Sequence, residues 1–394
     1  MVINRLFSGD TPRSAVLSAL LVVIVLALAF APFLFPGPLA YRTYSTICVF
    51  IMLVLSYDIL LGYTRIISFA HAMFYGIGAY AMAIALRDIG PGWGAIALGL
   101  GAGLVTALAV AFVIALFSLR VKAVFFALVT LAVAVGFMTL VSKLYHFTGG
   151  EDGIAFRVPF VLGPGYTLTD EPLPGFNLVG FLTSGDLAGS VFDVRTSGMV
   201  LVYYLLFISA IVVFFALLRM MNSPFGRVCK AIRENEFRAE ALGYRTVAYR
   251  TINVCISAMI AAFAGALAAL SLRYINPEST LSFDLMVNVL LITVIGGMGT
   301  LYGAVVGTAL FVLAETYLQD LLAMAHDASA SVPVLHGLLD PERWYLWLGL
   351  LFVLSVYFFP RGIVGQLRLG SEGRARRRGP AAISPETDPQ ETHG

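Results

Sequence analysis

Long apolar runs recur along the whole chain, and they limit its possible folds more than any other feature. About ten such runs lie between residues 14 and 360, and most reach about 20 residues, the length at which a helix crosses a hydrocarbon core of roughly 30 Å. A transmembrane β-barrel would show short alternating segments instead. Because a backbone in lipid must satisfy its own hydrogen bonds, we expect an all-α, polytopic transmembrane helical bundle.

The charge content supports this expectation. Only 12% of the 394 residues are charged and 59% are hydrophobic, whereas a soluble domain carries roughly 25% charged residues. The chain therefore has too little charge to cover itself with a wetted surface. The predicted spans lie at 14–35, 41–61, 66–86, 95–118, 124–145, 199–219, 250–272, 284–300, 303–321 and 343–360.

The distribution of Lys and Arg predicts the orientation of the chain. With a cytoplasmic N-terminus, most of the 25 basic residues fall on the cytoplasmic side, and the reverse topology would invert this ratio. We therefore expect both termini in the cytoplasm, an outer loop at 146–198 and a cytoplasmic loop at 220–249. Residues 1–366 then form one membrane domain, and residues 367–394 form a disordered cytoplasmic tail. A cleavable signal peptide is the alternative for the first run, although that run is long for one.

Motifs of several other functions are absent from the sequence. The five histidines and three cysteines show no metal-ligand spacing, and none of the lysines follows a glycine in a phosphate-binding loop. A basic stripe for nucleic acid is also missing. We therefore expect a non-catalytic chain that binds no metal, cofactor or nucleic acid. Of the alternatives, an ion-driven secondary transporter would need coupled buried carboxylates, and a membrane enzyme would need a cluster of acids or histidines.

Two polar, glycine-containing interruptions of the apolar pattern, at 61–80 and 295–307, are the first candidate functional region. Polar groups at membrane depth are costly and usually face the bundle interior or a cavity, and paired interruptions in two halves point to a translocation path in transporters. If 66–86 is one helix, Ser68 and His71 share a face, because they are three residues apart. The candidate path residues are Arg65, Ser68, His71, Gly76, Gly78, Gly296, Gly297 and Gly299. The alternative is that the glycines only allow close helix packing and that His71 is an interhelical hydrogen-bonder.

The loop at 220–249 is the second candidate region, because it predicts an amphipathic helix. Ser223 followed by Pro224 is typical of a helix start, and Gly243 is typical of a helix stop. Such a helix lies on a membrane surface or docks into the groove of a partner, and the mixed charge of this one favours a protein partner. The apolar stripe consists of Val228, Ile232, Ala239 and Leu242.

Four segments together resemble the LivM-type permease subunits of branched-chain amino acid ABC importers. The resemblance covers roughly residues 40–360, and the similar segments are 60–80, 148–153, 223–243 and 295–303. In that family, the segment that corresponds to Glu240, Ala241 and Gly243 belongs to a coupling helix in a cleft of the ATPase subunit. The resemblance thus implies a set of ATPase-coupling residues: Arg233, Glu234, Asn235, Ala239, Glu240, Ala241 and Gly243.

The resemblance also implies the partners and the substrate class. We expect a multi-pass protein of the bacterial plasma (inner) membrane that works with a second, LivH-like permease, two ATP-binding cassette ATPases that carry ATP–Mg, and a periplasmic substrate-binding protein. The expected substrates are leucine, isoleucine and valine. Arg65 and Ile66 depart from the small or aliphatic residues usual in the early motif, and the loop at 146–198 is longer than expected. Urea, short amides and aromatic or dicarboxylic acids are therefore the alternative substrates. We predict that Arg65 lines the inner end of the path or pairs with Asp58.

Overall fold

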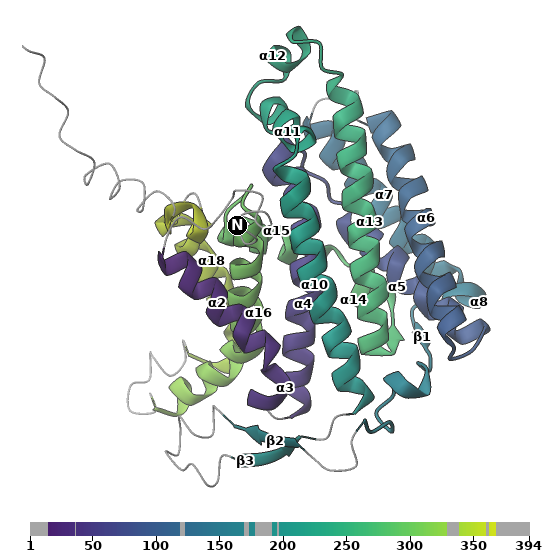
Figure 1. The fold of residues 1–394 in the computed structure, drawn as a ribbon, viewed down its shortest axis with the longest axis vertical. Coiled ribbons are helices and arrows are strands. Elements are labelled where there is room, and N and C mark those ends of the chain that lie inside the picture. The colour runs from purple at the N-terminus through teal and green to yellow at the C-terminus, as the bar shows by residue number, and fades with distance from the viewer. Residues whose placement is uncertain are drawn as a thin grey trace, which may run out of the picture.

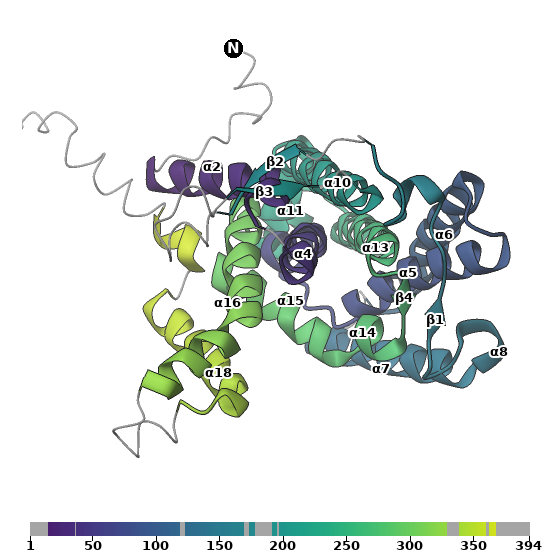
Figure 2. The same cartoon turned by 90° about the horizontal axis from the view of Figure 1, so that it is seen from below.

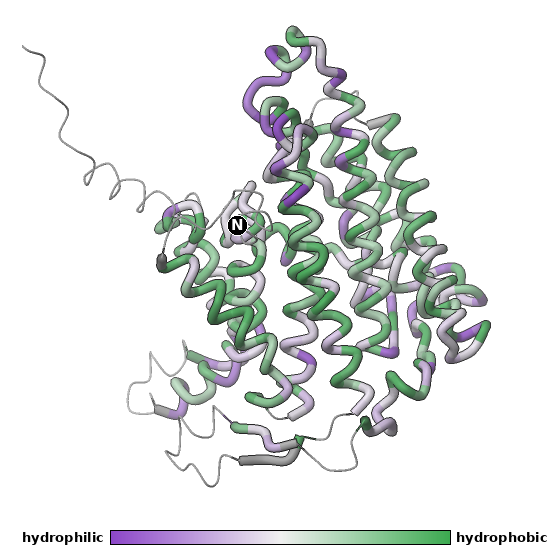
Figure 3. The backbone as a smooth tube through the Cα atoms, viewed as in Figure 1, coloured by the Kyte–Doolittle hydropathy of each residue, from purple (hydrophilic) through white to green (hydrophobic). Residues whose placement is uncertain are grey.

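The computed structural model describes residues 15–35, 37–118, 123–168, 173–177, 191–194, 197–328, 339–359 and 362–367. It confirms the predicted helical bundle: Figure 1 shows long helices lying side by side, and Figure 3 shows apolar residues along most of their length. The long helices are α2 (Ala15–Ala29), α4 (Pro38–Thr64), α5 (His71–Asp88), α6 (Trp93–Ser118), α7 (Ala123–Lys143), α10 (Gly198–Met221), α13 (Thr246–Leu272), α15 (Phe283–Gly296), α16 (Leu301–Ala328) and α18 (Trp344–Phe358).

Eight helical segments within the described residues are long and apolar enough to cross a membrane. They comprise α4, α6, α7, α10, α13, α16, α15 together with the short helix α14 (Pro277–Leu281), and α18 with its flanking residues from the 3-10 helix η2 (Pro341–Arg343) to Leu367. The apolar part of α2 is shorter, and α5 is not among the eight. The number of spans and the side on which the termini lie therefore stay predictions. The predicted tail at 367–394, apart from Leu367, lies outside the described residues.

The centre of the bundle is formed by α4, α5 and α13, as the view along the helices shows (Figure 2). Helices α5 and α13 approach each other so closely that only glycine fits at two positions. A Cβ atom on Gly78 would overlap the backbone of Ala262, and one on Gly265 would overlap the carbonyl group of Tyr75. Small residues at a contact allow such close approach of two helices in a membrane.

Two predicted spans begin or end at the wrong residue. The span predicted at 66–86 is helical only from His71, because Arg65 takes a left-handed conformation (φ 54°) that ends α4, and residues 66–70 then run without a helix. Ser68 and His71 therefore do not share a helix face, which corrects that prediction. The span predicted at 284–300 stops at Gly296, since Gly297 and Gly299 have positive φ angles of 112° and 80° and form a turn before α16.

The first predicted span, 14–35, is also interrupted. Helix α2 ends at Ala29, and a separate short helix, α3 (Ala31–Leu34), follows. Pro32 is the physical reason, because a proline has no N–H to continue the hydrogen bonds of the preceding turn. Two tyrosine hydroxyls of α10 hold this end of α2: Tyr203 donates to the carbonyl oxygen of Leu28, and Tyr204 donates to that of Ala29 at 3.0 Å.

Small strands and short helices lie on one end of the bundle. Strand β1 (Ile154–Ala155) pairs antiparallel with β4 (Tyr274–Ile275), and β2 (Leu173–Phe176) pairs antiparallel with β3 (Val191–Val194). Figure 1 shows β2 and β3 at the end opposite to the helices α11 (Pro224–Glu234) and α12 (Glu236–Ala241). The remaining short helices of this region are α8 (Tyr145–Thr148) and the 3-10 helix η1 (Phe160–Leu162).

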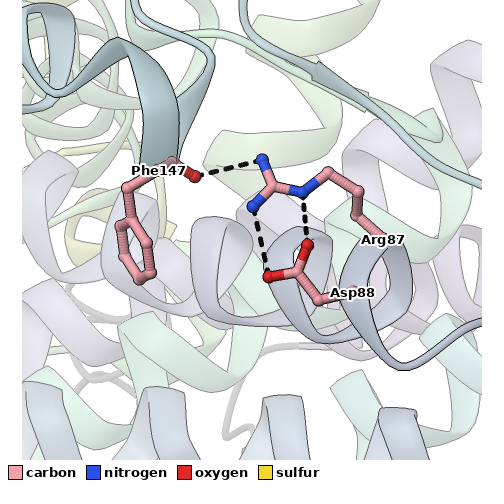
Figure 4. A network of polar contacts seen from close by, with 3 residues as sticks. All are labelled: Arg87, Asp88 and Phe147. Carbon is pink, nitrogen blue, oxygen red and sulfur yellow. Dashed lines mark hydrogen bonds and ion pairs between the residues drawn. The ribbon is translucent and has the colours of Figure 1, made fainter.

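An arginine fastens the end of α5 to α8 (Figure 4). Arg87 donates from Nε and Nη2 to the two carboxylate oxygens of Asp88, at 2.6 Å and 3.2 Å, and from Nη1 to the carbonyl oxygen of Phe147 at 3.1 Å. The side chains of Arg87 and Asp88 are 31% and 52% exposed, so we attribute to this contact a local positioning role and little stability.

Candidate functional site

The loop at 220–249 folds into two short helices, α11 (Pro224–Glu234) and α12 (Glu236–Ala241), that project from one end of the bundle (Figure 1). The single helix predicted from Ser223 to Gly243 is therefore wrong. Asn235 has an extended backbone (φ −157°) between the two helices, and its side chain accepts a hydrogen bond from the backbone N–H of Arg238 at 3.0 Å. An asparagine that caps the second helix in this way ends the first.

The predicted start and stop of this region are confirmed. Pro224 is the first residue of α11, and Gly243, with φ 89°, comes directly after the C-cap of α12. The hydroxyl of Ser223, however, accepts no capping hydrogen bond from α11; it donates to the carbonyl oxygen of Met220 at 2.6 Å.

A small apolar core holds α11 and α12 together. Val228, Ile232 and Ala239 are buried against one another and against Tyr249 of α13, which confirms three of the four residues of the predicted stripe. Leu242, the fourth, is 71% exposed, because it lies beyond the end of α12. Burial also raises the pKa of the neighbouring Cys229 thiol to about 11, so this side chain stays neutral and packs as an apolar group.

Polar contacts fix α12 onto the beginning of α13. The Arg250 guanidinium holds both carboxylate oxygens of Glu236, with Nη1 to Oε1 at 2.6 Å and Nη2 to Oε2 at 2.9 Å. The hydroxyl of Thr246 donates to Oε1 of Glu240 at 2.7 Å. Glu240, one of the predicted coupling residues, therefore positions α12 within this chain.

The predicted coupling residues are brought together by this fold, but they differ in exposure. Ala239 is buried and Arg233 is partly buried, whereas the others are exposed: Glu234, Asn235, Glu240, Ala241 and Gly243. Two large apolar side chains stand out at the same place, since Phe237 is 84% and Leu242 is 71% exposed. We call Phe237 and Leu242 the α12 tip.

Phe237 was not among the predicted residues. The sequence did carry a sign of it: Phe237 is an aromatic residue that stands between charged residues and outside the apolar stripe. Exposed apolar side chains that lie together mark an interaction site, whereas singly scattered ones are normal on a protein surface. The α12 tip is therefore the candidate contact surface at this end of the bundle.

A second polar cluster lies in the centre of the bundle, around His71. Its Nε2 atom lies 2.7 Å from the hydroxyl oxygen of Ser257, and that hydroxyl donates its single proton to the carbonyl oxygen of Ser56. His71 must therefore carry its proton on Nε2. These contacts join α4, α5 and α13, and Asn253 adds another by donating to the carbonyl oxygen of Ile59 at 2.7 Å. They match the interhelical hydrogen-bonding alternative for His71.

The glycines of the predicted path lie at helix contacts. A Cβ atom on Gly76 would overlap the side chain of Leu281, and one on Gly296 would overlap the backbone of Gly303. Gly78 packs against α13 as described above, and Gly297 and Gly299 form the turn between α15 and α16. Ser68 is buried in the non-helical connection before α5. That these residues line a path stays a prediction.

Arg65 does not pair with Asp58. The side chain of Arg65 is exposed at the end of α4, whereas Asp58 is 1% exposed and accepts a hydrogen bond from the backbone N–H of Gly299 at 2.7 Å. Glu315, an acid inside the predicted span 303–321, accepts a hydrogen bond from Asn288 at 3.4 Å. Among the described residues, no group of three or more His, Cys, Asp or Glu side chains could hold a metal ion.

The described residues thus form a helical membrane bundle with a helix pair that projects from one end. Residues 39–356 match the family described as the branched-chain amino acid transport system permease component, and the chain belongs to this family. This confirms the resemblance seen in the sequence.

Individual relatives agree with the family match. The chain is 27% identical over 350 residues to the high-affinity branched-chain amino acid transport system permease protein LivM of Salmonella typhimurium. The aligned region covers 89% of this chain and 75% of that protein. The identity to LivM of Escherichia coli K12 is also 27%, over 351 residues and the same shares of both chains. To LivH of Escherichia coli K12 it is 25% identical over 340 residues, 84% of this chain and 94% of that protein. No solved structure matches the chain significantly.

Proposed function

We propose that this chain is the membrane-spanning permease subunit of an ATP-driven ABC importer for the branched-chain amino acids leucine, isoleucine and valine. The observation that carries the proposal is the match to the permease family over residues 39–356. The relatives named LivM and LivH support branched-chain amino acids over urea, amides or aromatic acids.

The projecting helix pair supplies the connection to an energy source. The sequence has no phosphate-binding loop, so ATP hydrolysis falls to a partner ATPase that carries ATP–Mg. The α12 tip inserts into a groove of that ATPase, because an apolar helix face in a groove is a recurring recognition mode. This assignment places the α11–α12 end in the cytoplasm, as the distribution of Lys and Arg predicts.

The other partners follow from the same class of importer. A second, LivH-like permease completes the pathway, and a periplasmic binding protein delivers the amino acid to the opposite end of the bundle, in the bacterial inner membrane. This chain itself takes no part in a chemical reaction. Its task is to change shape when the ATPase subunits bind and hydrolyse ATP.

Uptake of labelled leucine by cells with and without this chain tests the proposal. We expect uptake to be lost without the chain, excess isoleucine to compete, and uptake to follow the ATP level. Uptake abolished by an uncoupler while the ATP level stays high would favour the ion-driven alternative. Unchanged leucine uptake together with lost uptake of urea, an amide or an aromatic acid would move the substrate to that class.

Gly243→Asp is expected to abolish uptake while the chain still inserts into the membrane. No atom of the described residues lies within 4 Å of the place that a Cβ atom would take, so the bundle tolerates the side chain. The positive φ of 89°, however, disfavours any side chain. The aspartate should therefore shift the backbone at the end of α12, next to the tip. Labelled-leucine uptake and immunoblots of membrane fractions measure both effects.

Gly90→Asp is the matched control. Gly90, in the turn between α5 and α6, also has a positive φ (103°) and equally open surroundings among the described residues. We expect this variant to keep normal uptake, because it lies far from α12. Equal uptake by the two variants would contradict a role of the α12 end in docking.

A further inference from the structure

Three segments that are far apart in the sequence meet near the end of α4. They are α4 itself, with Asp58 and Gly62, the turn at 297–300 with Gly299, and α11 with Arg233. The backbone N–H of Gly299 donates to Oδ1 of Asp58 at 2.7 Å. This hydrogen bond connects α4 directly to the turn that joins α15 to α16.

The glycines show that no gap separates these segments. A Cβ atom on Gly62 would overlap both the Asp58 carboxylate and the backbone of Gly299. A Cβ atom on Gly299 would overlap Nη1 of Arg233. The guanidinium of α11 thus rests on the turn, and the turn rests on α4. We call Asp58, Gly62, Gly299 and Arg233 the junction.

The charges at the junction make it depend on the position of α11. Asp58 is 1% exposed, and its Oδ2 atom has no hydrogen-bond partner among the described residues. Arg233 forms no ion pair with this carboxylate, but its guanidinium lies against Gly299, close enough for its positive charge to act on Asp58. A nearby positive charge favours the ionised form of a buried carboxylate, so a displacement of α11 removes a stabilising charge from the arrangement that the Asp58–Gly299 hydrogen bond holds.

A second cation of α11 also reaches α4. Nζ of Lys230 lies 5.4 Å from the centre of the Tyr63 ring, a cation–π geometry. Lys230 and Arg233 are three residues apart, so they extend from the same side of α11. Helix α11 therefore contacts the end of α4 through Lys230 and the turn at 297–300 through Arg233, while α12 presents its tip to the outside.

We propose that Arg233 and Asp58 are positioning residues that transmit movements of the α11–α12 pair to the turn at 297–300 and hence to α15 and α16. This inference rests on the proposed function, in which an ATPase moves the α12 tip. The positive φ angles of Gly297 and Gly299 make this turn the point where the chain between the two helices can change direction. Two sites are coupled physically when both of them act on one element that has two arrangements. Here the element is the turn at 297–300, and the contact that can be displaced is that of Arg233.

The test uses the complete importer reconstituted in vesicles, with leucine uptake and ATP hydrolysis measured on the same preparation. We expect the importer with Arg233→Ala to assemble with its ATPase subunits and to hydrolyse ATP. Its ratio of leucine transported to ATP hydrolysed should fall about tenfold, within the usual range of coupling between sites. Arg233→Lys should restore part of this ratio, because it keeps a cation facing Asp58. Arg227→Ala is the matched control, since Arg227 is an exposed arginine of the same helix.

A double variant tests whether the two residues act as one unit. If they do, Asp58→Ala combined with Arg233→Ala lowers the ratio no further than the worse single variant. A ratio for Arg233→Ala equal to that of wild type, or equal to that of Arg227→Ala, overturns the inference. If Arg233→Ala fails to assemble, Arg233→Lys and Asp58→Asn are measured instead, and wild-type ratios in both overturn it.

Failure of the inference is distinguishable from failure of the proposed function. Wild-type vesicles that show no ATP-dependent leucine uptake would refute the proposed function. Normal uptake by wild type, together with a normal ratio for the junction variants, would refute only transmission through Arg233 and Asp58.

Discussion

Gly78→Ala is expected to destabilise the bundle by about 3 kcal/mol, the upper part of the range for overpacking a core. The added methyl group would overlap the backbone of Ala262, so α5 and α13 would have to move apart. A flexible side chain could turn away, but a backbone cannot. Because His71 and Ser257 join the same two helices, their 2.7 Å contact would lengthen as well. Thermal unfolding of the purified protein in detergent measures the effect.

Gly101→Ala provides the comparison for this prediction. Gly101 lies within α6, and no described atom lies within 4 Å of its Cβ position, so alanine should stabilise the helix by up to about 1 kcal/mol. Gly265→Ala should behave like Gly78→Ala, because it meets the carbonyl group of Tyr75 from the other helix. Equal unfolding midpoints for the Gly78 and Gly101 variants would contradict the close contact of α5 and α13.

The sequence predicted the fold class well because the requirements of lipid are strong and local. A long apolar run that must satisfy its own hydrogen bonds can only be a helix. Helix ends were harder to predict, since hydropathy does not show where the backbone turns. The left-handed conformation of Arg65 is an example: a non-glycine residue gives no local sign of a positive φ. The glycine turn after Gly296 was visible as an interruption, but its limits were not.

The projecting helix pair was predicted in part for a similar reason. Pro224 and Gly243 act locally, and both were recognised. The break at Asn235 was missed because the apolar spacing continues across it, while the side chain of Asn235 caps a new helix. The contact of Asp58 with Gly299 joins residues 241 positions apart, and a single sequence carries no sign of such a pair.

Phe237→Ala is expected to weaken binding of the ATPase subunit about 30-fold, the loss of roughly 2 kcal/mol typical of an aromatic anchor in an interface. Phe237 is 84% exposed, so its removal leaves the apolar core of Val228, Ile232 and Ala239 intact. The variant should therefore fold and insert normally and lose affinity alone. The dissociation constant of the purified ATPase for this chain in lipid nanodiscs measures the effect, and Leu242→Ala should show a smaller loss.

Phe160→Ala is the control for this prediction, because Phe160 is 72% exposed and lies in η1, near the opposite end of the bundle. It should bind the ATPase as wild type does. An unchanged dissociation constant for Phe237→Ala would remove the α12 tip from the interface, whatever the family match implies. A loss confined to the tip variants would place the ATPase on this end of the bundle. Since the ATPase is cytoplasmic, the same result would establish the orientation that the distribution of Lys and Arg predicts.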